Sequence, residues 1–257
     1  MRISPEQIQS EYYGRTASIY DDMHTTGDDA HYEALKLIDM YCERFRLESL
    51  LDVGAGTGRG VNFLLSRKRK VYGLEPVRAL IEQAECQGLP KSSFIEGTGY
   101  ALPFKDASFD AVFECGVLHH VRDPSRVIHE MIRVSRRAVF LSDSNRFGQG
   151  RTVDRLVKLG LYLCKLWDVA KFIQTRGKMY SISEGDGLAY SYSVFDSYWQ
   201  LAGWADVIWT VRTDYAQSAK SWLDPLITAS HVLLCAFKHG DVPHAKIPIF
   251  KPPVSSG

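Results

Sequence analysis

Short apolar runs recur through the middle of the chain, and most of them end close to a glycine or an acidic residue. They cover residues 50–53, 71–74, 109–117 and 138–141. Apolar runs of this length predict buried strands, and the amphipathic stretch 59–66 after the first run predicts a helix. Strands that alternate with helices from residue 49 to 143 predict a parallel sheet with helices on both faces. We therefore expect an α/β fold with a doubly wound, mostly parallel sheet.

Two longer segments flank this alternating region. Residues 5–45 have a helical pattern, with a helix predicted from Asp29 to Phe45. After residue 145 we expect, in order, a helix-like stretch over 153–173, a loop over 177–192, a short helix near 194–201, and strands over 207–211 and 231–237. Long insertions at the carboxyl edge of a sheet usually build substrate sites, so the aromatic-rich insertion is predicted to cap an acceptor pocket. The predicted units are an N-terminal helical segment (1–46), a core (47–145), a cap (146–204), closing strands (205–240) and an irregular tail (241–257).

The first apolar run leads directly into a glycine-rich turn, in which Asp52 is followed by Gly54, Gly56 and Gly58. Glycines after a strand let the backbone turn sharply and let a ligand approach the main chain. A dinucleotide site would place its third glycine at position 59, which is Arg59. This spacing therefore argues against a nicotinamide or flavin cofactor and leaves a nicotinamide-dependent oxidoreductase as the weaker alternative.

The next apolar run, 70–74, ends in Glu75. One strand–helix–strand unit beyond the glycine turn, a carboxylate can accept the hydrogens of both ribose hydroxyls. Two charge-assisted hydrogen bonds to one carboxylate are strong and geometrically selective. The alternative is a solvent-facing strand end. We predict that Glu75 binds the ribose of an adenosine-containing cofactor.

Two further segments complete an ordered set of motifs. Residues 94–104 end in leucine–proline–phenylalanine, and residues 108–124 contain serine–phenylalanine–aspartate followed by leucine–histidine–histidine. Together with the glycine turn and Glu75, this order resembles the class I S-adenosylmethionine-dependent methyltransferases. Within that class it resembles the small-molecule group of type 11, ubiquinone-biosynthesis-like enzymes. The resemblance extends over roughly residues 12–145 and rests on four motifs at their usual spacings.

The resemblance implies a Rossmann-like sheet of seven strands, closed by an antiparallel pair, with the N-terminal helices folded over the cofactor as a lid. It implies S-adenosylmethionine as the cofactor and S-adenosylhomocysteine as the product. The implied cofactor-binding residues are Tyr20, Asp52, Gly54, Ala55, Gly56, Gly58, Glu75, Pro76, Thr98, Gly99, Tyr100, Cys115 and Gly116. Thr98 departs from the family, which often has an aspartate there for the adenine amino group. A threonine hydroxyl can still accept one such hydrogen bond.

The methyl group of this cofactor is bound to a sulfonium and is already electrophilic, so positioning the acceptor supplies much of the rate. A hydroxyl acceptor also needs a base that works near neutral pH, and histidine suits that role. His119 and His120 follow the fourth strand, at the crevice edge of the sheet. Asp143, after the fifth strand, can orient such a histidine. The alternatives are a loop-capping role for the histidines and a turn role for Asp143.

The acceptor pocket is predicted from aromatic residues in the lid and the cap. The candidate substrate-binding residues are Tyr12, Tyr13, Asn145, Tyr190 and Tyr192. The same rings can also be ordinary core. Basic residues of the insertion, Lys165, Lys171, Arg176 and Lys178, can meet a phosphate or carboxylate of the acceptor, contact an anionic membrane surface, or form a solvated helix face. No metal is expected, because Asp143 and Asn145 match the adjacent aspartate and asparagine of catechol-type methyltransferases only loosely, and the acids of the stretch 21–31 are typical of a solvated loop in the lid.

The composition of the chain limits the kinds of partner molecule that we expect. The formal net charge of the 257 residues is +1, which is unlike a nucleic-acid-binding protein. Five dispersed cysteines without a CxxC pair fit a reducing cytoplasm, and we see neither a signal peptide nor a transmembrane stretch. We therefore expect a cytoplasmic enzyme that methylates a small molecule at a hydroxyl of a sugar, lipid precursor or secondary metabolite. N-methylation of an amine and a non-catalytic cofactor-binding regulator are the alternatives, and the sequence does not specify an oligomeric state.

Overall fold

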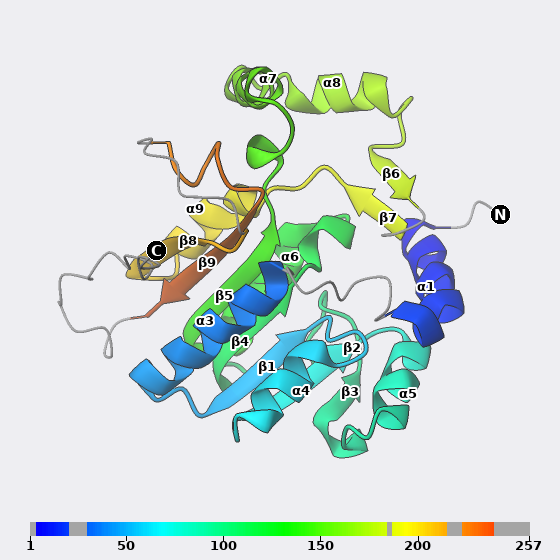
Figure 1. Cartoon of the computed structure of the whole chain (residues 1–257), viewed down its shortest axis with the longest axis vertical. Coiled ribbons are helices and arrows are strands. Elements are labelled where there is room, and N and C mark those ends of the chain that lie inside the picture. The colour runs from blue at the N-terminus through cyan, green and yellow to red at the C-terminus, as the bar shows by residue number, and fades with distance from the viewer. Residues whose placement is uncertain (1–3, 21–29, 184–186, 215–222, 239–257) are drawn as a thin grey trace, which may run out of the picture.

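A seven-stranded sheet forms the centre of the protein (Figure 1). The computed structural model describes residues 4–20, 30–183, 187–214 and 223–238, so the predicted tail and Asp29 lie outside the described residues. The strands are β1 (Ser49–Val53), β2 (Lys70–Glu75), β3 (Phe94–Glu96), β4 (Phe109–Cys115), β5 (Ser135–Ser144), β8 (Val207–Arg212) and β9 (His231–Phe237). Their order across the sheet is β3-β2-β1-β4-β5-β9-β8. β9 alone runs antiparallel to both its neighbours, which confirms the predicted mostly parallel sheet with its antiparallel closing pair.

Helices cover both faces of this sheet. They are α3 (Ala30–Phe45), α4 (Arg59–Ser66), α5 (Arg78–Cys86), α6 (Pro124–Val134) and α9 (Tyr198–Ala202). One apolar cluster joins α3 and α4 to the sheet, and another joins α6 and α9 to the opposite face. Leu35 and Ile38 on the inner face of α3 are fully buried in the first cluster, and Tyr41 packs against it partly buried. Pro124 occupies the first turn of α6 after the N-cap Asp123, as its fixed φ favours.

Single-turn 3₁₀ segments join several of these elements. They are η1 (Ala17–Ile19), η2 (Lys91–Ser93), η3 (Leu118–His120), η4 (Arg146–Gly148) and η5 (Val194–Ser197). η3 follows β4 and η4 follows β5, so both lie at the carboxyl ends of central strands, where ligands bind in doubly wound sheets.

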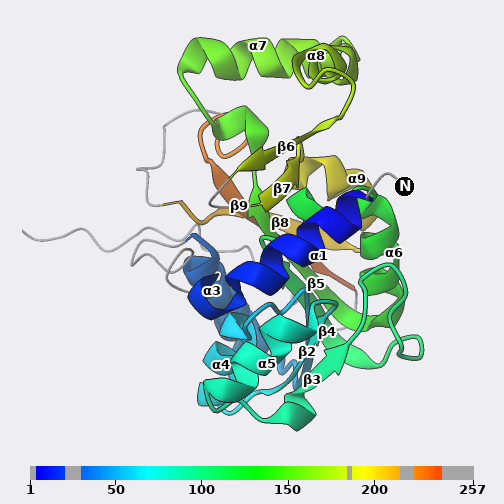
Figure 2. The ribbon, with the colours of Figure 1, turned by 90° about the vertical axis from the view of Figure 1, so that its right-hand side faces the viewer.

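The cap stands apart from the sheet and differs from prediction in two ways (Figures 1 and 2). The helix-like stretch predicted over 153–173 is helical but divided, because α7 (Thr152–Leu163) and α8 (Trp167–Gln174) are separated at Lys165, which adopts a left-handed φ of 58°. The predicted loop over 177–192 contains a hairpin of β6 (Tyr180–Ser183) and β7 (Gly187–Tyr190). Neither α7 nor α8 has a buried residue, and both leave large apolar side chains exposed.

The N-terminal helix α1 (Pro5–Thr16) lies between the cap hairpin and α5 (Figure 2). Ser4 and Gln7 form a reciprocal capping box that satisfies two backbone donors at its start. The helix contains no buried residue, so its attachment depends on a few contacts along one side. Within the described ranges, no helix combines the length and hydropathy needed to cross a bilayer.

Candidate active site

A cavity of about 440 Å³ lies at the carboxyl ends of the central strands, beneath α1. Most of the residues predicted to bind the cofactor line it. They are Tyr20, Gly54, Gly56, Glu75, Pro76, Thr98, Gly99, Tyr100, Cys115 and Gly116. Three residues predicted for the chemistry or the acceptor, Tyr13, His120 and Tyr190, line it as well.

The glycine turn shapes the floor of this cavity. Gly54 has a φ of 79°, and a Cβ at this position would lie 2.6 Å from a methyl group of Val117. Gly56 also has a positive φ, and the ring of Tyr20 passes 3.8 Å from where its Cβ would be. Both positions therefore require glycine, and the ring of Tyr20 covers the turn from the lid side.

Glu75 is fixed by the turns that flank it. The amide of Gly56 donates to Oε2 at 2.9 Å, and the amide of Val77 donates to Oε1 at 2.9 Å. Burial raises the pKa of Glu75 to about 7, although both amides act to lower it. Each carboxylate oxygen keeps a lone pair for one further donor, which fits the two hydroxyls of a ribose.

Three of the predicted cofactor residues do not line the cavity. Asp52 is buried under the start of α4, where a Cβ on Gly60 would lie 2.4 Å from Oδ2. Burial raises its pKa to about 7. Gly58 packs against Leu89 and Phe94, and Ala55 packs in the core beside Gly73. The structure therefore places these three residues in support of the turn.

His119 and Asp143 form a buried pair. Nδ1 of His119 lies 2.7 Å from Oδ1 of Asp143, and the His119 amide donates to Oδ2 at 3.2 Å. Burial alone would raise the pKa of the fully buried Asp143, but the charge and hydrogen bond of His119 lower it to about 2. The ionised Asp143 orients the imidazole and stabilises its protonated form, as in a catalytic triad.

His120 faces the lid and the hairpin. Its Nδ1 lies 2.7 Å from the carbonyl oxygen of Leu188, which can only accept, so Nδ1 carries the proton. Its Nε2 then accepts from the hydroxyl of Tyr13 at 3.0 Å. Both ring nitrogens are thus engaged by protein groups. The rings of His119 and His120 lie 3.9 Å apart, centroid to centroid.

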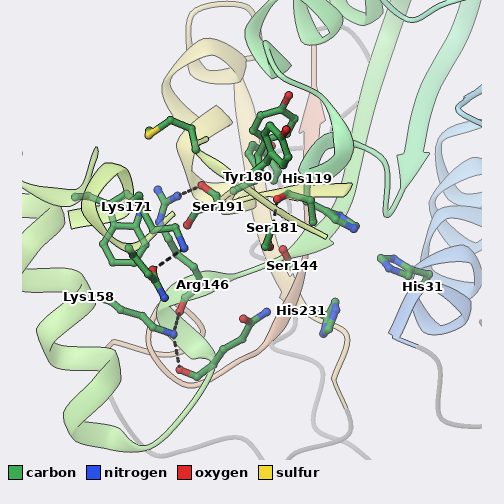
Figure 3. A pocket seen from close by; sticks show the side chains of 17 residues that line it. His31, His119, Ser144, Arg146, Lys158, Lys171, Tyr180, Ser181, Ser191 and His231 are labelled. Atoms are coloured by element: carbon green, nitrogen blue, oxygen red, sulfur yellow. Dashed lines mark hydrogen bonds between the residues drawn. The ribbon is translucent and has the colours of Figure 1, made fainter. Parts of the chain in front are cut away.

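A second cavity of about 500 Å³ lies between the sheet and the underside of α7 and α8. His119, His31 and His231 contribute to its lining, and Figure 3 shows His31 and His231 on the side away from Lys158 and Lys171. Tyr190 lines both cavities. Because His120 borders the first cavity and His119 the second, the histidine pair and Tyr190 lie between the two cavities.

The residues predicted to bind the substrate lie in different parts of the structure. Tyr190 and Tyr192 line the second cavity. Tyr12 lies against the hairpin, 2.8 Å from where a Cβ of Gly187 would be, and borders neither cavity. The prediction of Asn145 as a substrate residue does not fit the structure. Its side chain is fully buried, donates to the carbonyls of Leu226 and Ala229, and accepts from Phe147 and Ser193.

Several site residues are absent from the sequence predictions. Glu114 is fully buried beside Asp143, and burial raises its pKa well above the usual range. An acid inside the apolar run of β4 is the signal that would have identified it. His31 contacts Ser142 through Nδ1 at 3.1 Å. Arg146 and Lys158 reach the second cavity from η4 and α7, and no motif marks either of them.

Comparison with known proteins shows that part of this chain is similar to a known family. Residues 51–141 match the family described as "Methyltransferase domain". Norajmaline N-methyltransferase of Rauvolfia serpentina is 33% identical over 114 residues, which is 40% of this chain and 38% of that protein. An uncharacterized methyltransferase of Mycobacterium tuberculosis is 36% identical over 87 residues, which is 34% of this chain and 35% of that protein. The chain thus spans little more than a third of the length of these curated relatives.

Solved structures share the fold over most of the chain. Magnesium protoporphyrin IX methyltransferase from Synechocystis, with bound S-adenosylhomocysteine, gives a TM-score of 0.59 at 16% identity and covers 91% of this chain and 100% of that chain. The 1,6-didemethyltoxoflavin-N1-methyltransferase of Burkholderia thailandensis gives 0.57 at 16% identity, covering 93% and 92%. At such identities the likeness concerns the fold.

Fold, glycine turn and Glu75 together define a Rossmann-like methyltransferase domain. Residues 51–141 are thus similar to the methyltransferase domain, and the fold is that of solved S-adenosylmethionine-dependent methyltransferases. S-adenosylmethionine is the cofactor of this class. The first cavity fits it, because Glu75 offers two carboxylate oxygens and the strained glycine turn keeps the approach to the main chain open.

Proposed function

We propose that this protein methylates a hydroxyl group of a small molecule, with His119 as the general base. The observation that carries the proposal is the His119–Asp143 pair at 2.7 Å, with His119 in the lining of the second cavity and beside His120 of the first. When bound, S-adenosylmethionine supplies an electrophilic methyl group. Glu75 and the glycine turn hold its ribose side in the first cavity, and the acceptor occupies the second.

In this proposal each residue has a distinct task. The ionised Asp143 keeps the His119 ring in one orientation and stabilises the positive charge that forms when His119 takes the hydroxyl proton. His120 positions the lid through Tyr13 and is not the base, because both its ring nitrogens are engaged by protein groups. α1 and the hairpin exclude water from the point of transfer.

The experiment compares His119→Ala with the unaltered protein in two assays. Transfer of labelled methyl from S-adenosylmethionine into a metabolite extract is followed by mass spectrometry, and S-adenosylhomocysteine affinity is followed by calorimetry. We expect the rate of methyl transfer to fall at least a hundredfold in the variant, since general-base catalysis contributes about 10²–10⁴ in rate. The affinity for S-adenosylhomocysteine should change less than twofold. Unchanged transfer would remove His119 from the mechanism.

N-methylation is the second candidate. It is favoured by the N-methyltransferase activity named for the Rauvolfia relative and for the Burkholderia structure. An amine that is neutral at the working pH needs no base, so His119→Ala would then retain most of its rate. Fragmentation of the labelled product distinguishes an O-methyl from an N-methyl group. Cofactor binding without any labelled product would favour a non-catalytic cofactor-binding protein.

A further inference from the structure

The second cavity has an unusual charge pattern. Its described lining contains Arg146, Lys158 and Lys171 together with three histidines, but neither an aspartate nor a glutamate. Figure 3 shows the two lysines on the cap side and His31 and His231 on the far side. Asp196, outside this lining, pairs with Arg146, which leaves Lys158 and Lys171 as the cations that attract anions into the pocket.

Arg146 is built into the wall of this cavity. Its side chain is only 8% exposed, and its guanidinium lies 5.0 to 5.4 Å from the ring centroids of Phe147, Tyr162 and Trp167. One Nη donates to the carbonyl of Ser191 at 2.6 Å, and the other pairs with Asp196. The aromatic cage holds the guanidinium rigidly.

Three donors on residues that line this cavity are buried and lack a hydrogen-bond partner among the described residues. They are Nε of Arg146, Nε1 of Trp167 and the hydroxyl of Tyr190. An unsatisfied buried donor costs about 1–3 kcal/mol. These three donors are covered by protein atoms, so they belong to the wall behind the cavity, and the charged side chains of the lining carry the argument for a ligand.

Lys158 and Lys171 face the same space without any ion pair in the described part of the chain. The Lys158 amine donates to the carbonyls of Arg146 and Gln149 at 3.2 and 3.1 Å, and the Lys171 amine donates to Gln174 at 2.9 Å. Burial is the main cause that lowers the pKa of both lysines, and the charge of Arg146 lowers both further. A bound anion would relieve this repulsion.

We propose that the second cavity is an oxyanion site, and that the acceptor carries a carboxylate or phosphate group held by Lys158, Lys171 and Arg146. The reacting group of the same molecule then points to His119 on another part of the wall. This inference deepens the proposed function by naming the acceptor's chemical class. The anion site itself does not depend on transfer activity.

The test measures binding of inorganic phosphate to the protein saturated with S-adenosylhomocysteine, by calorimetry at constant ionic strength. We expect saturable binding that weakens at least fivefold in Lys158→Gln and in Lys171→Gln. Lys165→Gln, on the exposed turn between the two helices, is the matched control and should bind like the unaltered protein. Acetate titrated in the same way identifies the anionic group of the acceptor. Tighter binding of phosphate indicates a phosphate group, and tighter binding of acetate indicates a carboxylate.

Two results would overturn the oxyanion site. One is the absence of saturable binding for both ions, and the other is equal weakening in all three variants, which would indicate general charge rather than a site. The proposed function is read out separately by S-adenosylhomocysteine affinity and by methyl transfer. If phosphate binding depends on Lys158 and Lys171 while no anionic fraction of an extract is methylated, that result would support the oxyanion site and reject the methyltransferase reaction.

Discussion

Glu75 combines a structural role with a binding role at the end of β2. Its two oxygens accept from amides of two different turns, so the carboxylate fixes the glycine turn before any ligand arrives. Burial raises its pKa to about 7, which means that a large fraction is protonated at neutral pH. Ribose hydroxyls donate to the ionised form, so binding and deprotonation are coupled.

We therefore expect S-adenosylhomocysteine to bind about tenfold more tightly at pH 8 than at pH 6, because the ionised fraction of a group with a pKa near 7 rises by about that factor. Calorimetry in buffers of differing ionisation enthalpy would also detect the proton released. Glu75→Gln should weaken binding and remove most of this dependence. A dependence of equal size in the variant would assign it to another group, such as Asp52.

The same raised pKa affects the stability of the cofactor-free protein in the opposite direction. Between pH 4.5 and about 7 the folded state binds more protons at Glu75 than the unfolded state does, so stability falls as pH rises through this window. Asp52, with a pKa also near 7, adds to the effect. Urea midpoints measured across this range should fall for the unaltered protein and fall less steeply for Glu75→Gln.

Asp143 gives a second prediction at this scale. Asp143→Asn keeps the shape of the side chain but removes the charge that stabilises protonated His119. We expect the methyl-transfer rate to fall by about 10²–10⁴, with S-adenosylhomocysteine affinity retained because Asp143 does not line the cofactor cavity. Rates measured with labelled cofactor check this, and a rate within threefold of the original would contradict the pairing.

Among the elements, four helices share one kind of ending. These helices are α3, α4, α7 and α8, and each is followed within two residues by a basic residue in the left-handed region. The amide of the residue after it donates to the carbonyl five positions earlier. The basic residues are Arg46, Lys68, Lys165 and Arg176. Glycine is the usual residue in this position, because a side chain there costs about 1–2 kcal/mol.

Lys68→Gly is therefore expected to stabilise the protein by about 1 kcal/mol. Lys68 is exposed, has a φ of 61°, and lies between α4 and β2. Lys70→Gly is the matched control, because Lys70 is exposed but lies in extended β2, where glycine weakens a strand. Urea unfolding followed by circular dichroism measures both. A destabilised Lys68→Gly would show that the lysine side chain makes a net favourable contribution.

The elements differ in how well they could be predicted from the sequence. The core strands were predicted because continuous apolar runs indicate burial on both faces, and β1 and β4 are buried almost throughout. The break at Lys165 could not be predicted, since the usual signal is a glycine and this position carries a lysine. β6 was missed because it alternates weakly and is mostly exposed, and it pairs only with β7.

The site was predictable to a similar degree. The cofactor-binding positions Gly54, Gly56 and Glu75 could be predicted from their spacing along one strand–helix–strand unit, so the local sequence was sufficient to identify them. Arg146 and Lys158 reach the second cavity only because the cap folds back over the sheet edge. Asn145 was predicted to bind the substrate, yet its amide satisfies backbone groups of a distant segment. Such long-range hydrogen bonds leave no periodic signal in the sequence.

For the molecule as a whole, three separate segments meet at His120. Its ring contacts Tyr13 of α1 and the carbonyl of Leu188 in β7, while Gln9 of α1 accepts from the Leu188 amide at 2.6 Å. The lid, the cap hairpin and the end of β4 are thereby joined directly above the cofactor cavity. Because α1 buries no residue of its own, these polar contacts carry much of its attachment.

We therefore expect Tyr13→Phe to loosen the lid without unfolding the protein. Loss of one hydrogen bond of about 1 kcal/mol should raise the S-adenosylhomocysteine dissociation constant about fivefold and speed amide exchange in α1. The thermal midpoint should change little, since the apolar clusters of the sheet do not include Tyr13. Tyr32→Phe, on the exposed side of α3, is the control. If exchange in α1 stayed unchanged in Tyr13→Phe while affinity fell, Tyr13 would act by touching the cofactor directly, and the lid would be held by its remaining contacts.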